Sequence, residues 1–191
     1  MFFMNKKINF LENLMLKNFV NILPIISCVE YNNEVILNIP SEKLLIVLTL
    51  LKKHIGFRYE ILSCISGVHI LNIQYSFIVV YDLLSISYSN RIRLKIFLPD
   101  SAINYSITSI YINGNWWERE IWDLFGIYFI GHPDLRRILT DYGFDGHPMN
   151  KNFPLSGFIE VRYNTIEKTI LKEPLEFDQE FRNFKYENTW S

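Results

Sequence analysis

The most restrictive feature of the sequence is a strict alternation of basic and apolar residues from residue 91 to residue 96. The side chains there follow in the order Arg91, Ile92, Arg93, Leu94, Lys95 and Ile96. Side chains on a β-strand point alternately to opposite faces, so this pattern predicts a strand with one buried face. The preceding run repeats large apolar residues at the same spacing, at Phe77, Val79, Tyr81 and Leu83. We therefore predict two neighbouring strands that meet near Asn90.

The residues before these strands predict a helix, a hairpin and a second helix. The first helix is expected around residues 10–17 and ends before Pro24. Residues 25–29 and 35–39 flank the turn pair Asn32-Asn33, which predicts a hairpin. Ser41 is a favourable N-cap for a helix over residues 42–55, and Gly56 follows it as a C-terminal glycine. The apolar face of this helix is predicted to carry Leu44, Val47, Leu48 and Leu51.

Another strand is predicted over residues 106–112, followed by a helix from Trp116 to about Phe125 that Asn115 would cap. Glu118 and Glu120 would lie in the first turn of this helix, where the helix dipole favours negative charge. Arg119 precedes Asp123 by four residues, which predicts an ion pair within the helix. The apolar face of the helix is predicted to carry Trp117, Ile121, Leu124 and Phe125. The expected fold is α+β, with helices packed on one face of a mostly antiparallel sheet.

The sequence from Gly126 onward has a different character. Prolines and glycines recur in it, and only residues 158–163 and 169–171 resemble strands. Aromatic residues are spread through it, which argues against disorder, and so long an irregular stretch is uncommon in a compact domain. Aromatic and arginine side chains are frequent interface anchors. We therefore predict a core domain over residues 1–126 and an extended C-terminal arm over residues 127–191 that docks on partner subunits.

Composition excludes several classes of protein. The chain has 191 residues and a formal net charge of -1, whereas nucleic-acid-binding domains are usually basic. Its two cysteines are too few for a disulfide framework, a four-cysteine zinc site or an iron–sulfur cluster of its own. The longest apolar stretches fall well short of a bilayer-spanning helix, so no direct membrane span is expected. Heavy use of Lys, Ile, Asn, Phe and Tyr is typical of an A/T-rich genome, such as that of an organelle or a parasite.

Two groups of polar residues could carry chemistry. Glu118, Arg119, Glu120 and Asp123 could form an acid/base pair or a carboxylate metal site, or a charged helix face that pairs with Arg136, Arg137 or a neighbouring subunit. The tripeptide Gly-His-Pro occurs twice, at residues 131–133 and 146–148. A metal-dependent hydrolase could use the residues His132, Asp134, Asp145 and His147. The alternative is that both histidines make hydrogen bonds within turns.

The run from Trp117 to Gly126, continuing through residues 129–139, closely resembles the signature of the 30 Kd subunit of respiratory complex I. The resemblance is specific over essentially all of positions 117–191 and looser before them. The positions that match the family motif are Trp117, Glu118, Arg119, Glu120, Asp123, Gly126, His132, Pro133, Leu135, Arg136, Arg137, Gly146, His147, Pro148, Lys151, Phe153, Pro154, Arg162, Tyr163, Glu173, Pro174, Arg182 and Trp190.

The resemblance implies a core structural subunit of the peripheral, quinone-module arm of NADH:ubiquinone oxidoreductase, which transfers electrons from NADH to ubiquinone and translocates protons. It implies that the motif residues lie at subunit interfaces and that none of them is catalytic. The implied partners are the 49 Kd and PSST-type subunits, and FMN, iron–sulfur clusters and ubiquinone are expected in partner subunits only. The implied location is the matrix side of the mitochondrial inner membrane, with the gene in the mitochondrial genome. The main alternative remains the stand-alone metal-dependent hydrolase.

Overall fold

The computed structural model describes residues 23–31, 34–71, 75–176, 182 and 184. The predicted opening helix, the turn pair Asn32-Asn33 and Trp190 lie outside these residues. The chain divides into two compact units, residues 1–151 and residues 152–191. This division falls later than the one that the sequence predicts after Gly126, because residues 127–151 share a unit with the helices and the main sheet.

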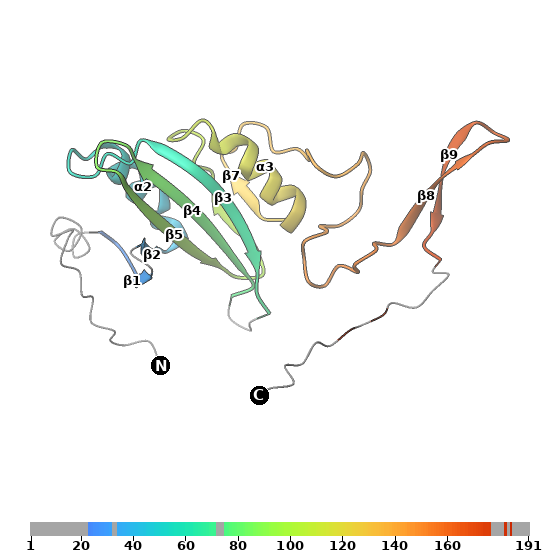
Figure 1. Cartoon of the computed structure of the whole chain (residues 1–191), viewed down its shortest axis with the longest axis horizontal. Helices are drawn as coiled ribbons and strands as arrows, with labels where there is room; N and C mark the ends of the chain where they lie inside the picture. The colour runs from blue at the N-terminus through green and yellow to red at the C-terminus, as the bar shows by residue number, and fades with distance from the viewer. Residues whose placement is uncertain (1–22, 32–33, 72–74, 177–181, 183, 185–191) are drawn as a thin grey trace. The chain divides into compact units, whose positions relative to one another are not determined.

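The first unit is built on a five-stranded sheet in the order β1-β2-β5-β4-β3 (Figure 1). Its strands are β1 (Ser27–Tyr31), β2 (Glu34–Asn38), β3 (Ile61–His69), β4 (Phe77–Ser85) and β5 (Asn90–Leu98). β1 and β2 form the predicted hairpin, and β3, β4 and β5 pair antiparallel in sequence order. Only the β2–β5 pair is parallel among the pairs of this sheet. The predicted mostly antiparallel sheet is confirmed.

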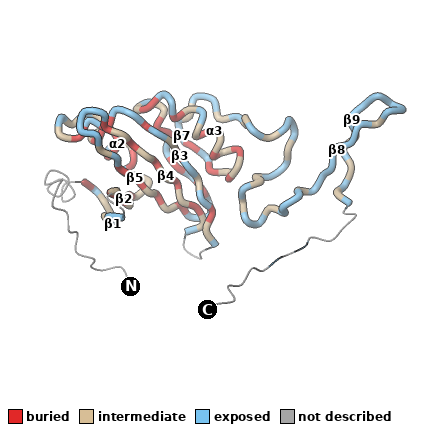
Figure 2. Tube along the Cα trace, viewed as in Figure 1, coloured by how far each residue is buried: buried red, intermediate tan, exposed pale blue. Residues whose placement is uncertain are grey.

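Alternation along β4 and β5 sorts their side chains onto two faces, as predicted. Val79, Tyr81, Leu94 and Ile96 are fully buried on one face, and the residues between them are partly exposed on the other. The helix α2 (Leu44–Lys53) adds Leu44, Val47, Leu48 and Leu51 to the same core, which are the four residues predicted for its buried face. Figure 2 shows that the buried positions gather in these strands and helices.

The helix α3 (Gly114–Phe125) packs against β3 on the buried face of the sheet. Gly67 pairs with the buried Val79, and a Cβ atom at Gly67 would lie 2.8 Å from the ring of Phe125. The close approach of α3 therefore requires a glycine at residue 67. Two short parallel strands, β6 (Ile103–Tyr105) and β7 (Tyr128–Ile130), flank α3 in the sequence. Both described helices lie on one face of the sheet, as expected for the α+β fold.

Both ends of α2 differ from the prediction. Ser41 begins a short 3-10 turn, η1 (Ser41–Lys43), and the residue at the N-cap position of α2 is Lys43. Leu44 begins the helix and Lys53 ends it, because His54 adopts an extended backbone with φ -69° and ψ 131°. The His54 ring nitrogen Nδ1 accepts a hydrogen bond from the backbone N–H of Gly56 at 3.0 Å. Gly56 lies two residues after the extended His54 and is not among the glycines with positive φ, so it is not a left-handed helix end.

The segment before α3 also differs from the prediction. Residues 106–112 form turns instead of a strand, because the backbone N–H of Ile107 binds the Glu118 carboxylate and its carbonyl accepts hydrogen bonds from Ile110 and Tyr111. The helix begins at Gly114 instead of Trp116, so Asn115 is no cap and Glu118 lies beyond the first turn. The strands β3, β6 and β7 were not predicted. None of the described helices is long and apolar enough to cross a membrane.

The second unit contains a hairpin of β8 (Ile159–Asn164) and β9 (Thr169–Pro174), close to the two predicted strand-like runs. Its register pairs Glu160 directly with Glu173, and Arg162 forms an ion pair with Glu173 at 2.7 Å. The opposite face carries four apolar side chains that are more than half exposed, namely Ile159, Val161, Tyr163 and Ile170, and also the exposed Lys172, which pairs with Val161. Figure 2 shows both strands as mostly exposed.

Candidate functional site

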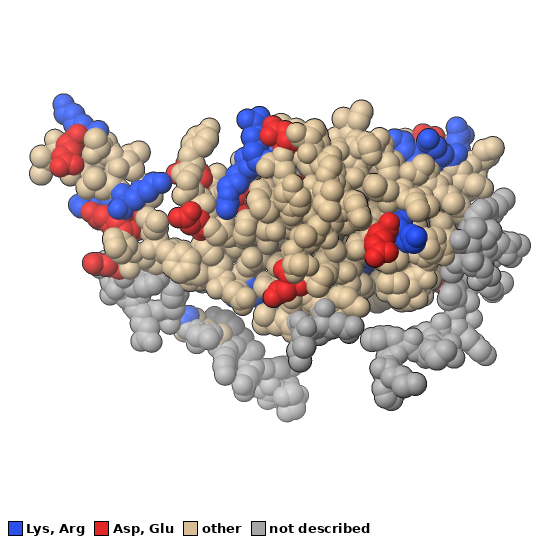
Figure 3. Space-filling view, turned by 180° about the vertical axis from the view of Figure 1, so that it is seen from behind, with Lys and Arg blue, Asp and Glu red and all other residues tan. Residues whose placement is uncertain are grey.

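The helix α3 places two carboxylates in the interior of the first unit. Glu118 and Asp123 are both 0% exposed, although charged residues are seldom fully buried unless they are paired. Residues 131–151 follow α3 and β7 and supply many of the partners of these carboxylates. We refer to α3 together with residues 131–151 as the α3 anchor. On the face that Figure 3 shows, by contrast, acidic and basic side chains are interspersed over a largely uncharged surface.

Asp123 binds the loop that follows the first Gly-His-Pro turn. Its Oδ2 accepts hydrogen bonds from the backbone N–H groups of residues 138, 139 and 140 at 3.2, 2.8 and 2.9 Å. Its Oδ1 accepts from Thr140 Oγ1 at 2.6 Å and from Arg137 Nη1 at 3.0 Å. Burial alone would raise the pKa of Asp123, but these hydrogen bonds outweigh burial and lower the pKa to about 2. Asp123 is therefore ionised at neutral pH and fixes three consecutive backbone groups.

Arg137 connects the Asp123 carboxylate to the second Gly-His-Pro turn. Its Nη1 also donates to the carbonyl oxygen of Gly146 at 2.9 Å, and its guanidinium lies 6.0 Å from the centre of the Phe144 ring. The predicted pairing of the helix with Arg137 is confirmed. The predicted ion pair between Arg119 and Asp123 is wrong. Arg119 reaches the loop instead, where its Nε donates to the carbonyl oxygen of Arg136 at 3.0 Å.

Glu118 binds the turn before α3 and approaches the first Gly-His-Pro turn. Its Oε1 accepts a hydrogen bond from the backbone N–H of Ile107, and its Oε2 accepts one from Ser106 Oγ, both at 2.7 Å. His132 Nε2 lies 3.8 Å from the same Oε2. Burial raises the pKa of Glu118 to about 7, although the two hydrogen bonds lower it. Glu118 is therefore the carboxylate of the anchor whose charge changes near neutral pH.

Both motif histidines bind backbone groups of α3. His132 Nδ1 accepts a hydrogen bond from the backbone N–H of Asp134, so the ring proton is on Nε2, which donates to the carbonyl oxygen of Asn115 at 3.1 Å. His147 Nδ1 lies 2.9 Å from the carbonyl oxygen of Asp123, so this nitrogen carries the proton that is donated. Each Gly-His-Pro turn is thus fixed to α3 through its histidine.

Gly126 allows the second turn to lie against the end of α3. It ends the helix in the left-handed conformation, with φ +79°. A Cβ atom on Gly126 would lie 2.7 Å from Cδ2 of the His147 ring. The backbone N–H of Met149 then donates to the carbonyl oxygen of Leu124 at 3.0 Å. The glycine therefore serves two purposes, because both the backbone angle and the contact with His147 exclude a side chain.

The family described as respiratory-chain NADH dehydrogenase, 30 Kd subunit, matches residues 37–159, which include all of α3 and both Gly-His-Pro turns. The chain belongs to this family. The protein named NADH-ubiquinone oxidoreductase subunit 9 of Reclinomonas americana is 45% identical over 157 residues, which cover 82% of this chain and 77% of the relative. The protein named NADH dehydrogenase [ubiquinone] iron-sulfur protein 3 of Beta trigyna is 49% identical over 144 residues, which cover 75% of each chain.

Solved structures of other proteins share the fold. One is described as Nqo5 of the trypsin-resistant fragment (1-134), with 26% identity and a TM-score of 0.52; the match covers 57% of this chain and 89% of that one. A second belongs to the membrane-bound sulfane sulfur reductase, an archaeal respiratory membrane complex, with 22% identity and a TM-score of 0.64. That match covers 73% of this chain and 84% of the other. At this identity, the second match shows a shared fold alone.

The alternative of a metal-dependent hydrolase gains no support from the geometry of this member of the 30 Kd subunit family. The described residues include no group of three or more His, Cys, Asp or Glu side chains that could hold a metal ion. His132 and His147 are bound to different carbonyl groups of α3. Asp134 forms an exposed ion pair with Arg136 at 3.0 Å.

The remaining motif positions of the 30 Kd subunit family lie in several places. Trp117 and Leu135 are partly buried against the core. The backbone N–H of Lys151 donates to Nδ1 of His69 at 2.9 Å. In the second unit, the rings of Phe153 and Phe158 meet edge to face at 5.3 Å. The other motif residues that the structure describes are partly or fully exposed, namely Glu120, Pro133, Pro148, Pro154, Arg162, Tyr163, Glu173, Pro174 and Arg182.

Sequence reasoning missed Thr140 of the anchor, and it missed Ser106 and His69, which bind the anchor from other parts of the chain. Ser106 and Thr140 bind the two buried carboxylates, and His69 accepts the hydrogen bond that fixes residue 151. Thr140 lies three residues after Arg137, so the pattern Arg-x-x-Thr after a buried aspartate could have indicated its role. His69 is far from α3 in the sequence, Ser106 lies outside the helix in the turn before it, and no helical spacing points to either residue.

The raised pKa of Glu118 predicts a pH-dependent stability. The folded protein keeps the Glu118 proton up to about pH 7, whereas the unfolded chain loses it near the ordinary pKa of 4.5. The contribution of Glu118 to stability is therefore fully present below pH 4.5, declines as the pH rises to 7 and then stays constant. Between pH 5 and pH 8, we expect the free energy of unfolding of wild type to fall by roughly 3 kcal/mol relative to that of Glu118→Gln, which has no proton to lose at this position. Urea unfolding of both proteins at pH 5 and pH 8 measures these free energies. If the difference between the variant and wild type is the same at both pH values, the prediction is wrong.

Proposed function

We propose that the chain is a non-catalytic structural subunit of the peripheral arm of NADH:ubiquinone oxidoreductase. In this role, the α3 anchor fixes the start of the C-terminal arm, and the arm docks on the 49 Kd and PSST-type subunits. One observation carries the proposal. Four charged residues of the family motif, namely Glu118, Arg119, Asp123 and Arg137, bind backbone groups of their own chain. Side chains whose hydrogen bonds are made within the chain hold a loop in place, and they offer few remaining hydrogen-bonding groups to a substrate.

The proposal assigns the redox chemistry to the partner subunits. The sequence has two cysteines, Cys28 and Cys64, whereas iron–sulfur clusters are usually held by four thiolates. We therefore place the iron–sulfur clusters in neighbouring subunits, and we propose that FMN and ubiquinone are bound there as well. The relatives named as subunits of NADH-ubiquinone oxidoreductase support the membership in this complex. We assign the chain to the matrix side of the mitochondrial inner membrane, in the peripheral arm.

The hairpin of the second unit supports docking of the arm. An isolated two-stranded hairpin is at best marginally stable in water. One face of this hairpin exposes Ile159, Val161, Tyr163 and Ile170 with Lys172 among them, and the other face carries the Arg162–Glu173 ion pair. A hydrophobic surface on a partner subunit would bury the apolar face and stabilise the hairpin. The charged face would then point away from that partner.

Limited digestion with trypsin tests the proposal. Trypsin cleaves after lysine and arginine, and the second unit exposes such residues at Arg162, Lys168 and Lys172. For the isolated chain, we expect rapid cleavage at these sites and a resistant fragment that ends near Lys151. The solved structure described as a trypsin-resistant fragment of Nqo5 supports the expectation that part of the chain resists trypsin. Within the purified respiratory complex, we expect cleavage at Arg162 and Lys168 to slow by at least about ten-fold, because docked segments must first detach.

Two results would contradict the proposal. Equal cleavage rates in the isolated chain and in the complex would show that the arm does not dock. Failure of the chain to co-purify with subunits that oxidise NADH would show that it belongs to another assembly.

A further inference from the structure

Glu118 and His132 approach each other in the interior of the first unit without forming a hydrogen bond. Both side chains are 0% exposed, and Glu118 Oε2 lies 3.8 Å from His132 Nε2. A hydrogen bond between such atoms needs about 2.7–3.2 Å. The Nε2–H group donates instead to the carbonyl oxygen of Asn115 at 3.1 Å. A movement of roughly 1 Å would therefore exchange one acceptor for the other.

The ionised form of Glu118 lacks a compensating charge. In the part of the chain that the structure describes, its carboxylate accepts two hydrogen bonds, from the backbone N–H of Ile107 and from Ser106 Oγ. The buried Asp123 accepts five, one of them from the Arg137 guanidinium. An ionised carboxylate in the interior is costly unless it is paired and hydrogen-bonded. Loss of the Glu118 proton therefore favours a movement that brings a further donor to Oε2.

The protonated form of Glu118 has no such need. A proton on Oε2 can be donated to Ser106 Oγ at 2.7 Å, and the Ser106 hydroxyl can in turn donate to Thr108 Oγ1 at 2.9 Å. The neutral carboxyl is then satisfied without His132. The Nε2–H group of His132 keeps its bond to the Asn115 carbonyl, because a neutral carboxyl offers no charge-assisted hydrogen bond.

Titratable groups on the strands around Glu118 stay neutral or are bound elsewhere. On β4, burial and the nearby charge of Glu118 raise the pKa of Tyr81 well above its usual value, so Tyr81 remains neutral. On β3, the buried His69 binds a backbone group of the α3 anchor. On β6 and β7, the side chains of Tyr105 and Tyr128 are exposed.

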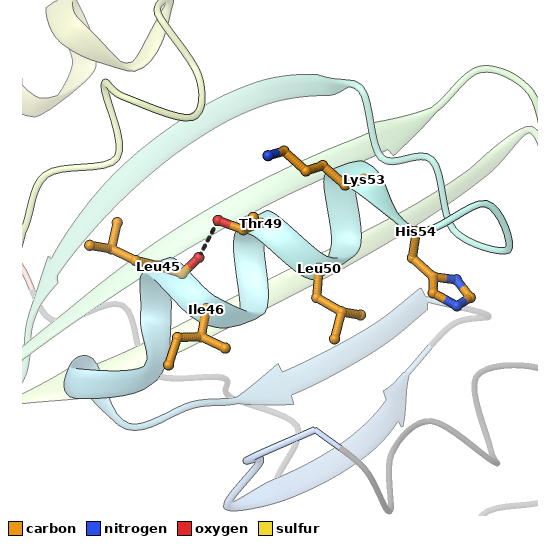
Figure 4. Close-up of a pocket in the computed structure, with 6 residues that line it drawn as sticks. All are labelled: Leu45, Ile46, Thr49, Leu50, Lys53 and His54. Carbon is orange, nitrogen blue, oxygen red and sulfur yellow. Dashed lines mark hydrogen bonds between the residues drawn. The ribbon is translucent and has the colours of Figure 1, made fainter.

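Charged groups on the helices are also bound or placed elsewhere. On α3, Arg119 and Asp123 bind the loop after the first Gly-His-Pro turn. On α2, Lys52 binds a backbone carbonyl of the turn before α3. Figure 4 shows that Lys53 and His54 line a hollow along α2 itself. Among the described residues, the histidine of the first Gly-His-Pro turn is thus left as the titratable partner of the buried carboxylate.

We propose that the first Gly-His-Pro turn is a pH-sensitive switch in which His132 exchanges one acceptor for another. When Glu118 carries its proton, His132 Nε2–H is bound to the Asn115 carbonyl. When Glu118 releases the proton to water, Nε2–H moves to Oε2 and the turn shifts with the ring. A hydrogen bond to a carboxylate is roughly twice as strong as one between neutral groups, which drives the exchange. The switch uses groups of this chain alone, so it does not depend on the proposed function.

NMR of the full chain, labelled with carbon-13 and nitrogen-15, tests the exchange. The Glu118 carboxyl carbon, the His132 ring nitrogens and the Asn115 carbonyl carbon are followed across neutral pH. Burial raises the pKa of Glu118 to about 7, so we expect all three signals to change with one midpoint near that pH. The His147 ring should not share this midpoint, because the charge of Asp123 does not change there. The proposal is wrong if His147 shares it, or if Glu118 changes while His132 and Asn115 do not.

Ser106→Ala shows whether Glu118 and His132 respond together. Burial raises the pKa of Glu118 and the Ser106 hydrogen bond lowers it, so this variant should raise the midpoints of both residues by at least about half a unit of pH. Thr140→Ala is the matched control, because it removes the corresponding hydroxyl from Asp123 and should leave both midpoints unchanged. A midpoint that rises for Glu118 alone would overturn the proposal.

Glu118→Gln distinguishes the switch from a titration of His132 itself. The substitution keeps the size of the side chain and removes the charge that depends on pH. We expect the His132 and Asn115 signals to lose their common midpoint, because a neutral amide offers no charge-assisted hydrogen bond. If both signals still change at the wild-type midpoint, His132 responds without Glu118 and the switch does not exist. The Ser106→Ala comparison holds even where Glu118→Gln does not fold.

Discussion

Asp123→Ala should destabilise the first unit by about 3–5 kcal/mol, because breaking a buried ion pair leaves its partner uncompensated. The substitution removes the acceptor for three consecutive backbone N–H groups, for Thr140 Oγ1 and for Arg137. Residues 131–151 should then detach from α3 more often, and their amide hydrogens should exchange faster with solvent. Urea unfolding and hydrogen exchange of the full chain measure the two effects. We also expect less of the variant chain in assembled respiratory complex.

Asp134→Asn is the matched control for Asp123→Ala. Asp134 lies in the same segment, but its ion pair with Arg136 joins side chains that are 57% and 72% exposed. Exposed ion pairs contribute about 0–1 kcal/mol, so this variant should remain close to wild type. If Asp123→Ala were as stable as Asp134→Asn, the buried carboxylate would not be what holds the loop.

Gly126→Ala should destabilise the same region by a different route. Alanine in the left-handed conformation costs about 1–2 kcal/mol. The added methyl group would also lie 2.7 Å from the His147 ring, and overpacking of this kind costs roughly a further 1–3 kcal/mol. The ring would have to move, which weakens the hydrogen bond from His147 Nδ1 to the carbonyl oxygen of Asp123. We expect a lower free energy of unfolding and a changed NMR signal for the His147 ring.

Gly131→Ala separates the two contributions at Gly126. Gly131 has a similar φ of +82°, but a Cβ atom there would meet nothing within 4 Å. This variant should therefore show the conformational cost alone, about 1–2 kcal/mol, with the His147 signal unchanged. Equal losses of stability in the two variants would show that contact with His147 contributes nothing.

The sequence predicted those parts of the fold that local patterns encode. Alternation predicted β4 and β5, and the apolar spacing of Leu44, Val47 and Leu48 predicted the buried face of α2. The strand β3 was missed because Ser63, Ser66 and Gly67 interrupt its apolar pattern and a bulge between Leu62 and Cys64 shifts its register. Its position depends on contact with α3, which no local pattern records.

The sequence identified many of the residues of the candidate site, but it did not identify which of them bind one another. Helical spacing assigned Arg119 to Asp123, because residues four apart lie on one helix face. In the folded chain Asp123 is turned inward and meets Arg137, fourteen positions further along. The choice of partner depends on how residues 131–151 turn back along α3, and that path is set by hydrogen bonds to backbone groups. Those groups are the same in every residue except proline, so sequence patterns do not identify them.

Turnover per assembled complex is the most direct test of the structural role. The respiratory complex is purified from cells that carry Asp123→Asn, which keeps the size of the side chain and removes its charge. The amount of assembled complex and its NADH:ubiquinone turnover are then measured separately. We predict that the amount falls and that turnover per assembled complex equals that of wild type. A complex that assembles in normal amounts but has lost its turnover would contradict a non-catalytic role for this chain.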